Sequence, residues 1–311
     1  MNEARNRLLE GLKDGLRKGL DGFIWMMKII LPISFLTALL DWSGLLSKMD
    51  FLLQPLMNLI GLPAAAALPL IIGMLANIYG GIAAMAVLPF TIEQMTLIAV
   101  FLLICHNLIQ EGVVQANSGI HPLKATLFRL TAAIITVWTC SLFLDTKTPF
   151  DASPGGLQAA SLPFAGMMKS WLFSMLGLSL KIFLIIMSIL TFLEIMKKMG
   201  WIHPVVRALS PLLRLMGLSR QVGMLWMTAV VFGLAYGGAV IVEEAKAGHL
   251  TREELQELHL SIGINHSMIE DPTLFLSFGL SPFWLWVPRF IMAILATRLL
   301  TLWVEFRKKG G

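Results

Sequence analysis

The chain of 311 residues repeats itself, and this duplication limits its fold more than any other feature. The segment KIILPISFLTALLD, from Lys28, matches KIFLIIMSILTFLE, from Lys181. Further matches follow in the same order in both halves: Tyr79-Gly80-Gly81 with Tyr236-Gly237-Gly238, Thr91 with Thr251, His106 with His266, Pro122 with Pro282, and Arg129 with Arg289. Leu-rich segments align with one another by chance, but chance does not match His, Arg and Tyr-Gly-Gly in order. We therefore predict two structurally similar repeats.

The composition indicates a polytopic membrane protein. Hydrophobic residues make up 57% of the chain and charged residues 14%, whereas soluble domains carry about 25% charged residues. This balance excludes a soluble enzyme, a disordered chain and a nucleic-acid-binding domain. The net charge of +5 gathers beside apolar segments, so it indicates orientation in a membrane rather than a nucleic-acid partner. Cys105 and Cys140 lie in apolar stretches and do not indicate a disulfide framework.

Each half contains four apolar segments, and a helix needs about 20 apolar residues to cross a bilayer. These segments are 23–41, 64–90, 92–118 and 122–145 in the first half, and 171–195, 219–243, 252–278 and 282–304 in the second. Short segments rich in Leu and Pro, 51–60 and 203–216, predict interfacial helices. We expect an amphipathic helix over 1–22 on the inner membrane surface, repeats over 23–145 and 171–304, an extracytoplasmic linker over 146–170 and a basic cytoplasmic tail over 305–311.

The charges of the connectors predict the topology. Connector 42–63 holds one lysine, whereas connector 196–220 holds five Lys and Arg residues and should be cytoplasmic. We expect the protein in the inner membrane of the cell. Both termini are basic, so we expect them on the cytoplasmic side. Because the linker 146–170 is expected on the other side of the membrane from both termini, each half must cross an odd number of times. One of its four segments must therefore enter and leave by the same face.

The segments 64–90 and 219–243 are our candidates for these re-entrant hairpins. Each would consist of two half-helices that meet at a turn in Tyr-Gly-Gly, where glycine adopts positive φ at no cost. The fold class predicted is therefore all-α, with two inverted-topology repeats, each holding an interfacial helix, a re-entrant hairpin, a broken helix and two further spans. Secondary transporters share this architecture and bind substrate near the membrane midplane.

Two polar stretches lie where hydrocarbon is expected, CHNLIQEGVVQANSG at 105–119 and NHSMIEDPTLFLSFG at 265–279. Each holds a histidine, an acidic or amide pair four and five residues later, and then a helix breaker. The four-residue spacing predicts that the histidine and the first of the pair share a helix face. A carboxylate at the bilayer centre costs at least ~2.5 kcal/mol, so these groups indicate a shared polar cavity. The candidate substrate- or ion-binding residues are Asn77, Tyr79, Gly80, Gly81, His106, Asn107, Gln110, Glu111, Tyr236, Gly237, Gly238, Asn265, His266, Ser267, Glu270 and Asp271.

Structural interpretations of the same residues remain open. The polar groups can tie helices together, Gly-Gly pairs can serve close helix packing, and Arg129 and Arg289 can pair with a repeat carboxylate or extend to the interface. Thr251 and Glu254 are expected to cap the next helix. We find no cofactor motif and no catalytic triad pattern, so we do not expect an enzyme. A metal site would need ligands from both halves, because neighbouring Cys105 and His106 point differently on a helix.

At Asn77-Ile-Tyr-Gly-Gly81, Ala235-Tyr-Gly-Gly238 and the two His-x-x-Ile stretches, the chain resembles the nucleoside-recognition (gate) domain family. That family includes spore maturation proteins A and B and the gate regions of the ferrous-iron permease. The resemblance covers 28–145 and 181–304, and a more distant one is to concentrative nucleoside transporters. It implies substrate contacts at hairpin tips and at helix breaks, here Gln110-Glu111-Gly112 and Glu270-Asp271-Pro272. Unlike the complete iron permease, the chain shows no soluble GTPase domain.

Three functions compete at this point. The first is a secondary transporter of a small polar solute, such as a nucleoside or nucleobase, in which Glu111, Glu270 and Asp271 carry ion coupling. The second is a divalent-metal permease that uses the same carboxylates and histidines. The third is a non-transporting membrane partner in a maturation or assembly complex, with its polar residues in a subunit interface. The partners expected are the lipid bilayer and a small molecule or ion, and a second copy or a partner subunit stays open.

Overall fold

A computed structural model describes residues 2–145, 163–201, 204 and 210–309, and every regular element in these ranges is a helix. The first half contains α1 Asn2–Trp42, α2 Leu45–Asn58, η1 Ala64–Ala66, α3 Ala67–Leu75, α4 Ile78–Val87, α5 Ile92–Ile104, α6 Leu108–Asn117 and α7 Pro122–Ser141. The second half contains α9 Phe164–Met199, α11 Ser210–Leu215, α12 Arg220–Lys246, α13 Arg252–Asn265, α14 Glu270–Phe275, η3 Leu276–Phe278 and α15 Pro282–Lys309.

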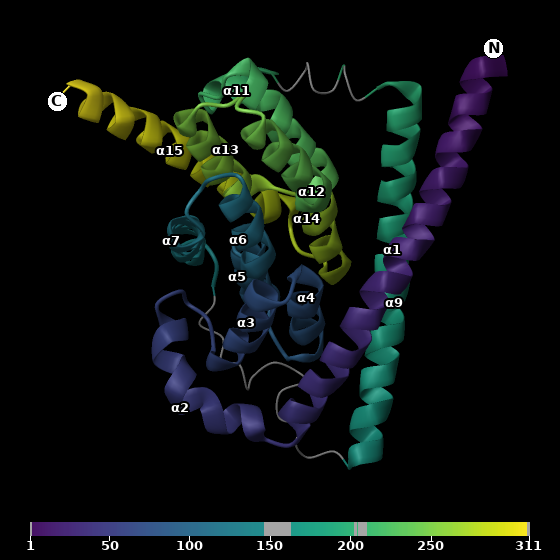
Figure 1. Cartoon of the computed structure of the whole chain (residues 1–311). Helices are drawn as coiled ribbons and strands as arrows, with labels where there is room; N and C mark the ends of the chain where they lie inside the picture. Colours follow the sequence, from purple (N-terminus) through teal and green to yellow (C-terminus); the bar gives the residue numbers. More distant parts are fainter. Residues whose placement is uncertain (1, 146–162, 202–203, 205–209, 310–311) are drawn as a thin grey trace.

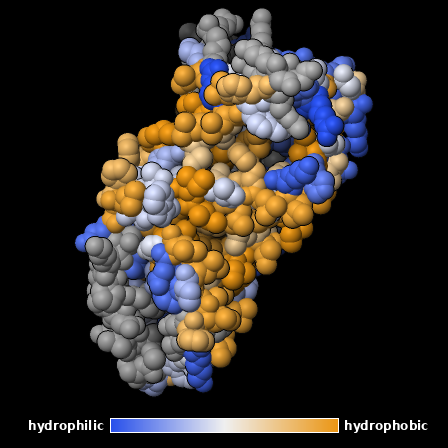
Figure 2. Space-filling model, turned by 90° about the vertical axis from the view of Figure 1, so that its left-hand side faces the viewer, coloured by the Kyte–Doolittle hydropathy of each residue, from blue (hydrophilic) through white to orange (hydrophobic). Residues whose placement is uncertain are grey.

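Five of the described helical segments are long and apolar enough to cross a membrane. They are Glu3–Trp42, Ile92–Asn117, Pro122–Ser141, Phe164–Met199 and Pro282–Trp303. Figure 2 shows an apolar surface across the middle of one face, with hydrophilic residues mainly towards its ends. An all-helical membrane protein is thus confirmed. The predicted span at 252–278 is not among the five, because α13 starts with charged residues and is separate from α14.

The long helices α1 and α9 run antiparallel beside the rest of the molecule (Figure 1). A Cβ atom on Gly11 would lie 2.9 Å from Ile195 Cα, and one on Gly15 would lie 2.5 Å from Thr191 Cα. Only glycine allows the two backbones to approach this closely. Residues 2–22 of the expected amphipathic helix form the first half of α1, which continues into the first apolar segment, and they pack against α9.

Each half folds two short apolar helices back on each other. In the first half, α3 and α4 meet at Asn77, whose side chain accepts a hydrogen bond from Gly80 N–H. In the second half, α12 reverses at Gly233, which has φ 73° and ψ 176°. The sequence predicted turns within Tyr-Gly-Gly, but both turns fall before that motif. Gly81 and Gly237 lie inside the second arm instead, where a Cβ atom would press on the first arm.

The two polar stretches interrupt their helices earlier than expected. The helix α5 ends at Ile104 and α6 starts at Leu108, while α13 ends at Asn265 and α14 starts at Glu270. The breaks therefore fall at the histidines and not at Gly112 or Pro272. The predicted shared helix face of each histidine and the residue four positions later is consequently absent, because the pair spans a break.

Helix caps fix where the broken helices begin. Thr91 and Gln94 form a capping box at the start of α5, and Thr251 and Glu254 form the equivalent box at the start of α13. In each box the threonine hydroxyl accepts the N–H of the third helical residue, and that residue's side chain accepts the threonine N–H. The cap expected at Thr251 and Glu254 is thus confirmed.

The interfacial elements lie at opposite ends of the molecule. Figure 1 places α2 at the bottom and α11 at the top, where α1 begins and α15 ends. Within the expected interfacial segment 203–216, residues 203 and 205–209 lie outside the described residues, and α11 is its described helix. Likewise, 146–162 of the expected linker and 310–311 of the expected tail lie outside them, whereas 164–170 belong to α9 and 305–309 to α15.

Candidate functional site at the meeting point of the two halves

Two histidines and two carboxylates from opposite halves meet in the interior. His106 Nε2 lies 3.1 Å from His266 Nε2. Each histidine also faces a carboxylate of the other half: His106 Nε2 lies 3.4 Å from Asp271 Oδ2, and His266 Nε2 lies 3.3 Å from Glu111 Oε1. All four side chains are buried. We call these four residues the central cluster.

Hydrogen bonds to the backbone fix the orientation of both imidazoles. His106 Nδ1 lies 2.7 Å from Leu102 O, and His266 Nδ1 lies 3.0 Å from Ile262 O. A carbonyl oxygen only accepts, so each Nδ1 must carry the hydrogen and donate it. In a neutral imidazole the other nitrogen then carries a lone pair. Both Nε2 atoms of the central cluster therefore face each other as acceptors.

Two buried arginines hold the broken helices around the central cluster. Arg129 donates to Ile104 O and His106 O at 2.7–3.0 Å, and Arg289 donates to Ile264 O and His266 O at 3.0–3.1 Å. These carbonyl groups are left without helical partners by the breaks, and an unpaired buried carbonyl is costly. The arginines therefore do not extend to the interface, since each replaces the missing backbone hydrogen bonds.

The first arginine also binds a carboxylate of the central cluster. Arg129 Nη1 lies 2.7 Å from Glu111 Oε2, with both side chains nearly inaccessible to solvent. Arg129 Nε further donates to Gly263 O in the other half at 2.8 Å. Within the described residues, Arg289 Nη1 has no hydrogen-bond partner. Both arginines thus donate to the equivalent carbonyls at their own break, whereas Arg129 also contacts Gly263 O and the Glu111 carboxylate.

The hairpin tips and the helix breaks touch in both halves. Asn107 N–H donates to Gly73 O at 3.1 Å, and Ser267 N–H donates to Ala229 O at 3.3 Å. Asn107 and Ser267 are the non-glycine residues with positive φ in the described chain, at 54° and 49°. Such φ values are uncommon outside glycine and mark positions fixed by their surroundings. Each hairpin thereby positions the histidine that precedes this residue.

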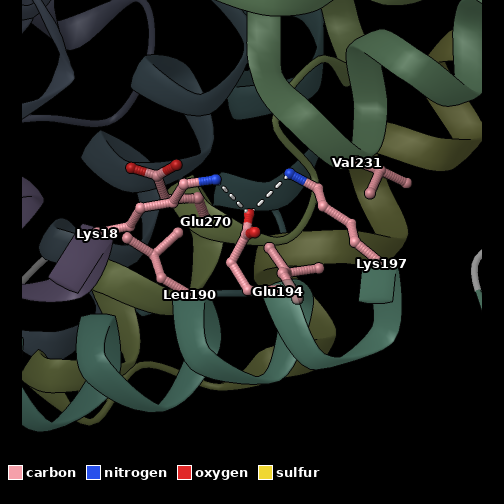
Figure 3. Close-up of a pocket in the computed structure, with 7 residues that line it drawn as sticks. Lys18, Leu190, Glu194, Lys197, Val231 and Glu270 are labelled. Carbon is pink, nitrogen blue, oxygen red and sulfur yellow. Dashed lines mark hydrogen bonds and ion pairs between the residues drawn. The ribbon is translucent and has the colours of Figure 1, made fainter. Parts of the chain in front are cut away.

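A cavity of about 520 Å³ lies beside the central cluster and reaches Glu270. Figure 3 shows Lys18 of α1 and Lys197 of α9 pointing toward the Glu194 carboxylate, and each Nζ lies 2.9 Å from Glu194 Oε1. Val231, near the second hairpin tip, lines the same cavity. Glu270 accepts a hydrogen bond from Tyr79 O–H at 2.8 Å. It also directly precedes Asp271, so the cavity wall and the central cluster share one stretch of backbone.

The remaining predicted site residues have other surroundings. Gln110 is exposed, and Asn77 caps α4. Gly80, Gly81, Gly237 and Gly238 lie in buried hairpin arms, whereas the side chain of Tyr236 falls outside the described residues. Asn265 is buried, and within the described chain its side-chain amide has no hydrogen-bond partner.

Sequence reasoning missed the charged cavity wall formed by Lys18, Glu194 and Lys197. These residues belong to α1 and α9, which were interpreted only as surface and spanning helices. One sequence signal could have placed them: Gly11, Gly15 and Gly19 recur every four residues. This spacing typically marks a close helix–helix contact in membranes.

The fold and the central cluster define a helical membrane protein with paired hairpins and broken helices. Residues 23–118 match the model of the Gate family, which is described as nucleoside recognition. This part of the chain is therefore similar to that family, which confirms the resemblance read from the sequence. The chain is also 27% identical to YvoD of Bacillus subtilis (strain 168), an uncharacterized membrane protein, over 300 residues, which cover 93% of this chain and 92% of YvoD. No solved structure matches the chain.

Proposed function

We propose that the protein is a secondary transporter of a small polar solute, with nucleosides and nucleobases as the first solutes to test. The solute would enter the cavity beside Glu270, and the central cluster would bind the coupling cation. We assign no catalytic step to the chain. Its termini would lie in the cytoplasm, as the positive-inside rule predicts.

The arrangement of the halves supports this proposal. The first elements of the two repeats, α1 and α9, run antiparallel, since Gly11 faces Ile195 while Gly15 faces Thr191. The interfacial helices α2 and α11 lie at opposite ends (Figure 1). Both features are expected when two repeats have inverted topology about an axis in the membrane plane. Transporters of this design bind substrate at broken helices near the midplane.

One observation carries the proposal: Glu270, which directly precedes Asp271 of the buried central cluster, lines an open cavity. The cavity volume of about 520 Å³ falls within the range of roughly 300–1,000 Å³ that is common for small-molecule sites. Its wall offers both signs of charge, since it includes Lys18, Glu194, Lys197 and Glu270. A solute that binds there would lie one residue from Asp271, so solute and cation occupancy would affect each other.

The test is uptake of labelled nucleosides, nucleobases, sugars and amino acids into proteoliposomes that contain the full chain. We expect uptake of one solute class, reduced roughly 10-fold or more in Glu270→Gln, because a hydrogen bond to a charged group contributes about 1.5–3 kcal/mol. The matched control is Glu253→Gln, which changes an exposed carboxylate at the start of α13 and should leave uptake unchanged. Absence of uptake for every solute would contradict transport and favour the role of a membrane partner.

A further inference from the structure

Acceptor atoms converge between the two imidazoles of the central cluster. Both Nδ1 atoms donate to backbone carbonyls, so both Nε2 atoms present lone pairs, 3.1 Å apart. Asp271 Oδ2 lies 3.4 Å from His106 Nε2, and Glu111 Oε1 lies 3.3 Å from His266 Nε2. Within the described chain, Glu111 Oε1 is buried and has no hydrogen-bond donor. The two Nε2 lone pairs and the Asp271 carboxylate lie close together and repel one another unless a cation lies between them.

We propose that the central cluster binds one divalent transition-metal ion, with His106 Nε2, His266 Nε2 and the Asp271 carboxylate as ligands. One ligand atom of each of these residues lies within 4.8 Å of the others. Glu111 Oε1 lies 3.3 Å from His266 Nε2, beside these three ligands. This inference rests on the proposed function for its role, since it names the cation that the transporter would couple to or carry.

The ligand spacing fits a tetrahedral ion. With metal–nitrogen bonds of about 2.0–2.1 Å, two imidazole nitrogens of a tetrahedral zinc site lie roughly 3.3 Å apart. The observed Nε2–Nε2 distance of 3.1 Å requires only a small separation of the rings. Imidazole and carboxylate together suit Zn²⁺, Fe²⁺, Co²⁺ and Ni²⁺ rather than Mg²⁺ or Ca²⁺, which prefer oxygen ligands.

The groups behind the ligands fit the same assignment. Histidines that bind metal almost always donate their other ring N–H to a carbonyl or carboxylate, which fixes the tautomer and the ring orientation. Both imidazoles do so here, at Leu102 O and Ile262 O. Arg129 and Arg289 are the nearby positive charges. Their Nε and Nη2 atoms donate to backbone carbonyls, and Arg129 Nη1 contacts Glu111 Oε2. The side of the central cluster where the two Nε2 atoms face each other therefore presents acceptor atoms.

The ion would connect the two halves of the molecule. His106 comes from the first half, whereas His266 and Asp271 come from the second. Bound metal would therefore hold the halves in the present arrangement, and its loss would free them to separate at the helix breaks. A bound ion stabilises the folded state by mass action.

The experiment measures metal binding by the purified full chain in detergent, with an affinity tag that lacks histidine. After chelator treatment, the protein is loaded with Zn²⁺ or Co²⁺, and the metal content and the visible Co²⁺ spectrum are recorded. We expect one ion per chain and the intense bands of a four-coordinate Co²⁺ complex. His106→Ala and His266→Ala should each weaken binding at least about 100-fold, since loss of a ligand should exceed the 10–100-fold cost of losing its supporting hydrogen bond.

The matched control is His249→Ala, because His249 is exposed and pairs with Glu244 outside the cluster. Wild type that binds no stoichiometric metal would overturn the proposal and leave a shared proton as the bridging cation. Retention of the ion in folded His106→Ala and His266→Ala would also overturn it. If those variants do not fold, X-ray absorption of Zn²⁺-loaded wild type decides: two imidazole ligands support the site, and fewer reject it.

Binding and transport fail separately in these experiments. Metal binding without uptake of any solute, including the metal itself, would retain the site and reject the transporter. Solute uptake by a chain that binds no metal would retain the transporter and reject the site.

Discussion

At the scale of single residues, the pairing of Arg129 with Glu111 combines two tasks. The guanidinium replaces backbone hydrogen bonds at the break between α5 and α6, and it balances a carboxylate of the central cluster. Removal of one partner from a buried ion pair leaves the other charge without compensation. The pair therefore couples the stability of the break to the charge of the site.

This coupling predicts the behaviour of a double-mutant cycle. Arg129→Met should destabilise the protein by about 3–5 kcal/mol, because Glu111 stays buried and unpaired. Adding Glu111→Gln to Arg129→Met should restore part of that loss, since the uncompensated charge is gone. Thermal unfolding in detergent measures all four proteins. Strict additivity of the two changes would show that the 2.7 Å contact contributes no coupling energy.

At the scale of elements, each hairpin depends on contact between its two arms. A Cβ atom on Gly237 would fall onto Cα of Ala229 in the opposing arm, so no side-chain rotation relieves the clash. In the first hairpin, a Cβ atom on Gly81 would lie 2.7 Å from Leu102 Cδ1 and 3.1 Å from Pro69 O. The glycines thus hold the hairpin arms together, and through them the tips and the helix breaks.

A methyl group at the arm contact should open the second hairpin. We expect Gly237→Ala to destabilise the protein by about 1–3 kcal/mol, the usual effect of overpacking. Gly177→Ala in α9 is the matched control, because its Cβ atom would meet nothing within 4 Å and alanine favours a helix by about 1 kcal/mol over glycine. Equal melting temperatures for the two variants would refute the arm contact.

The sequence predicted the elements better than their turning points. Leu-rich segments of sufficient length predicted helices, and equivalent segments recurred in both halves. The turn at Gly233 was missed because a glycine at a turn and a glycine at a helix contact look alike in sequence. The break was placed at Gly112 and Pro272 because helix breakers are local signals, whereas the actual breaks depend on Arg129 and Arg289, which bind the freed carbonyls from 23 to 25 residues away.

The candidate site was predicted in its members but not in its pairing. His106, His266, Glu111 and Asp271 were recognised because polar groups in apolar stretches are rare. Their crosswise contacts depend on how two halves pack, and no spacing within one half encodes that. The spacing instead suggested pairs within a half, such as His106 with Gln110, and Gln110 is exposed.

At the scale of the whole molecule, the α1–α9 pair forms one wall of the cavity. Its glycines set the distance between the two helices, and Lys18 of α1 pairs with Glu194 of α9 across it. The cavity also borders Glu270 of the second half. We therefore expect the spacing of this pair to affect access to the candidate site.

A wider α1–α9 spacing should follow from Gly15→Ala, whose Cβ atom would lie 2.5 Å from Thr191 Cα. We expect a longer distance between spin labels at the exposed positions Leu20 and Leu184, together with a lower melting temperature. Gly22→Ala is the control, since its Cβ atom meets a side chain at an ordinary 3.5 Å. An unchanged label distance in Gly15→Ala would reject this role of the pair.

The crosswise contacts of the central cluster limit how such a chain can be divided. Each imidazole faces an acid supplied by the other half, so neither half holds a matched acid–base pair of its own. A shorter polypeptide with only one of these units would have to associate with a complementary unit, or with a second copy in the opposite orientation, before its histidine met a carboxylate. Fusion of the two units into one chain makes that association unimolecular and therefore independent of protein concentration.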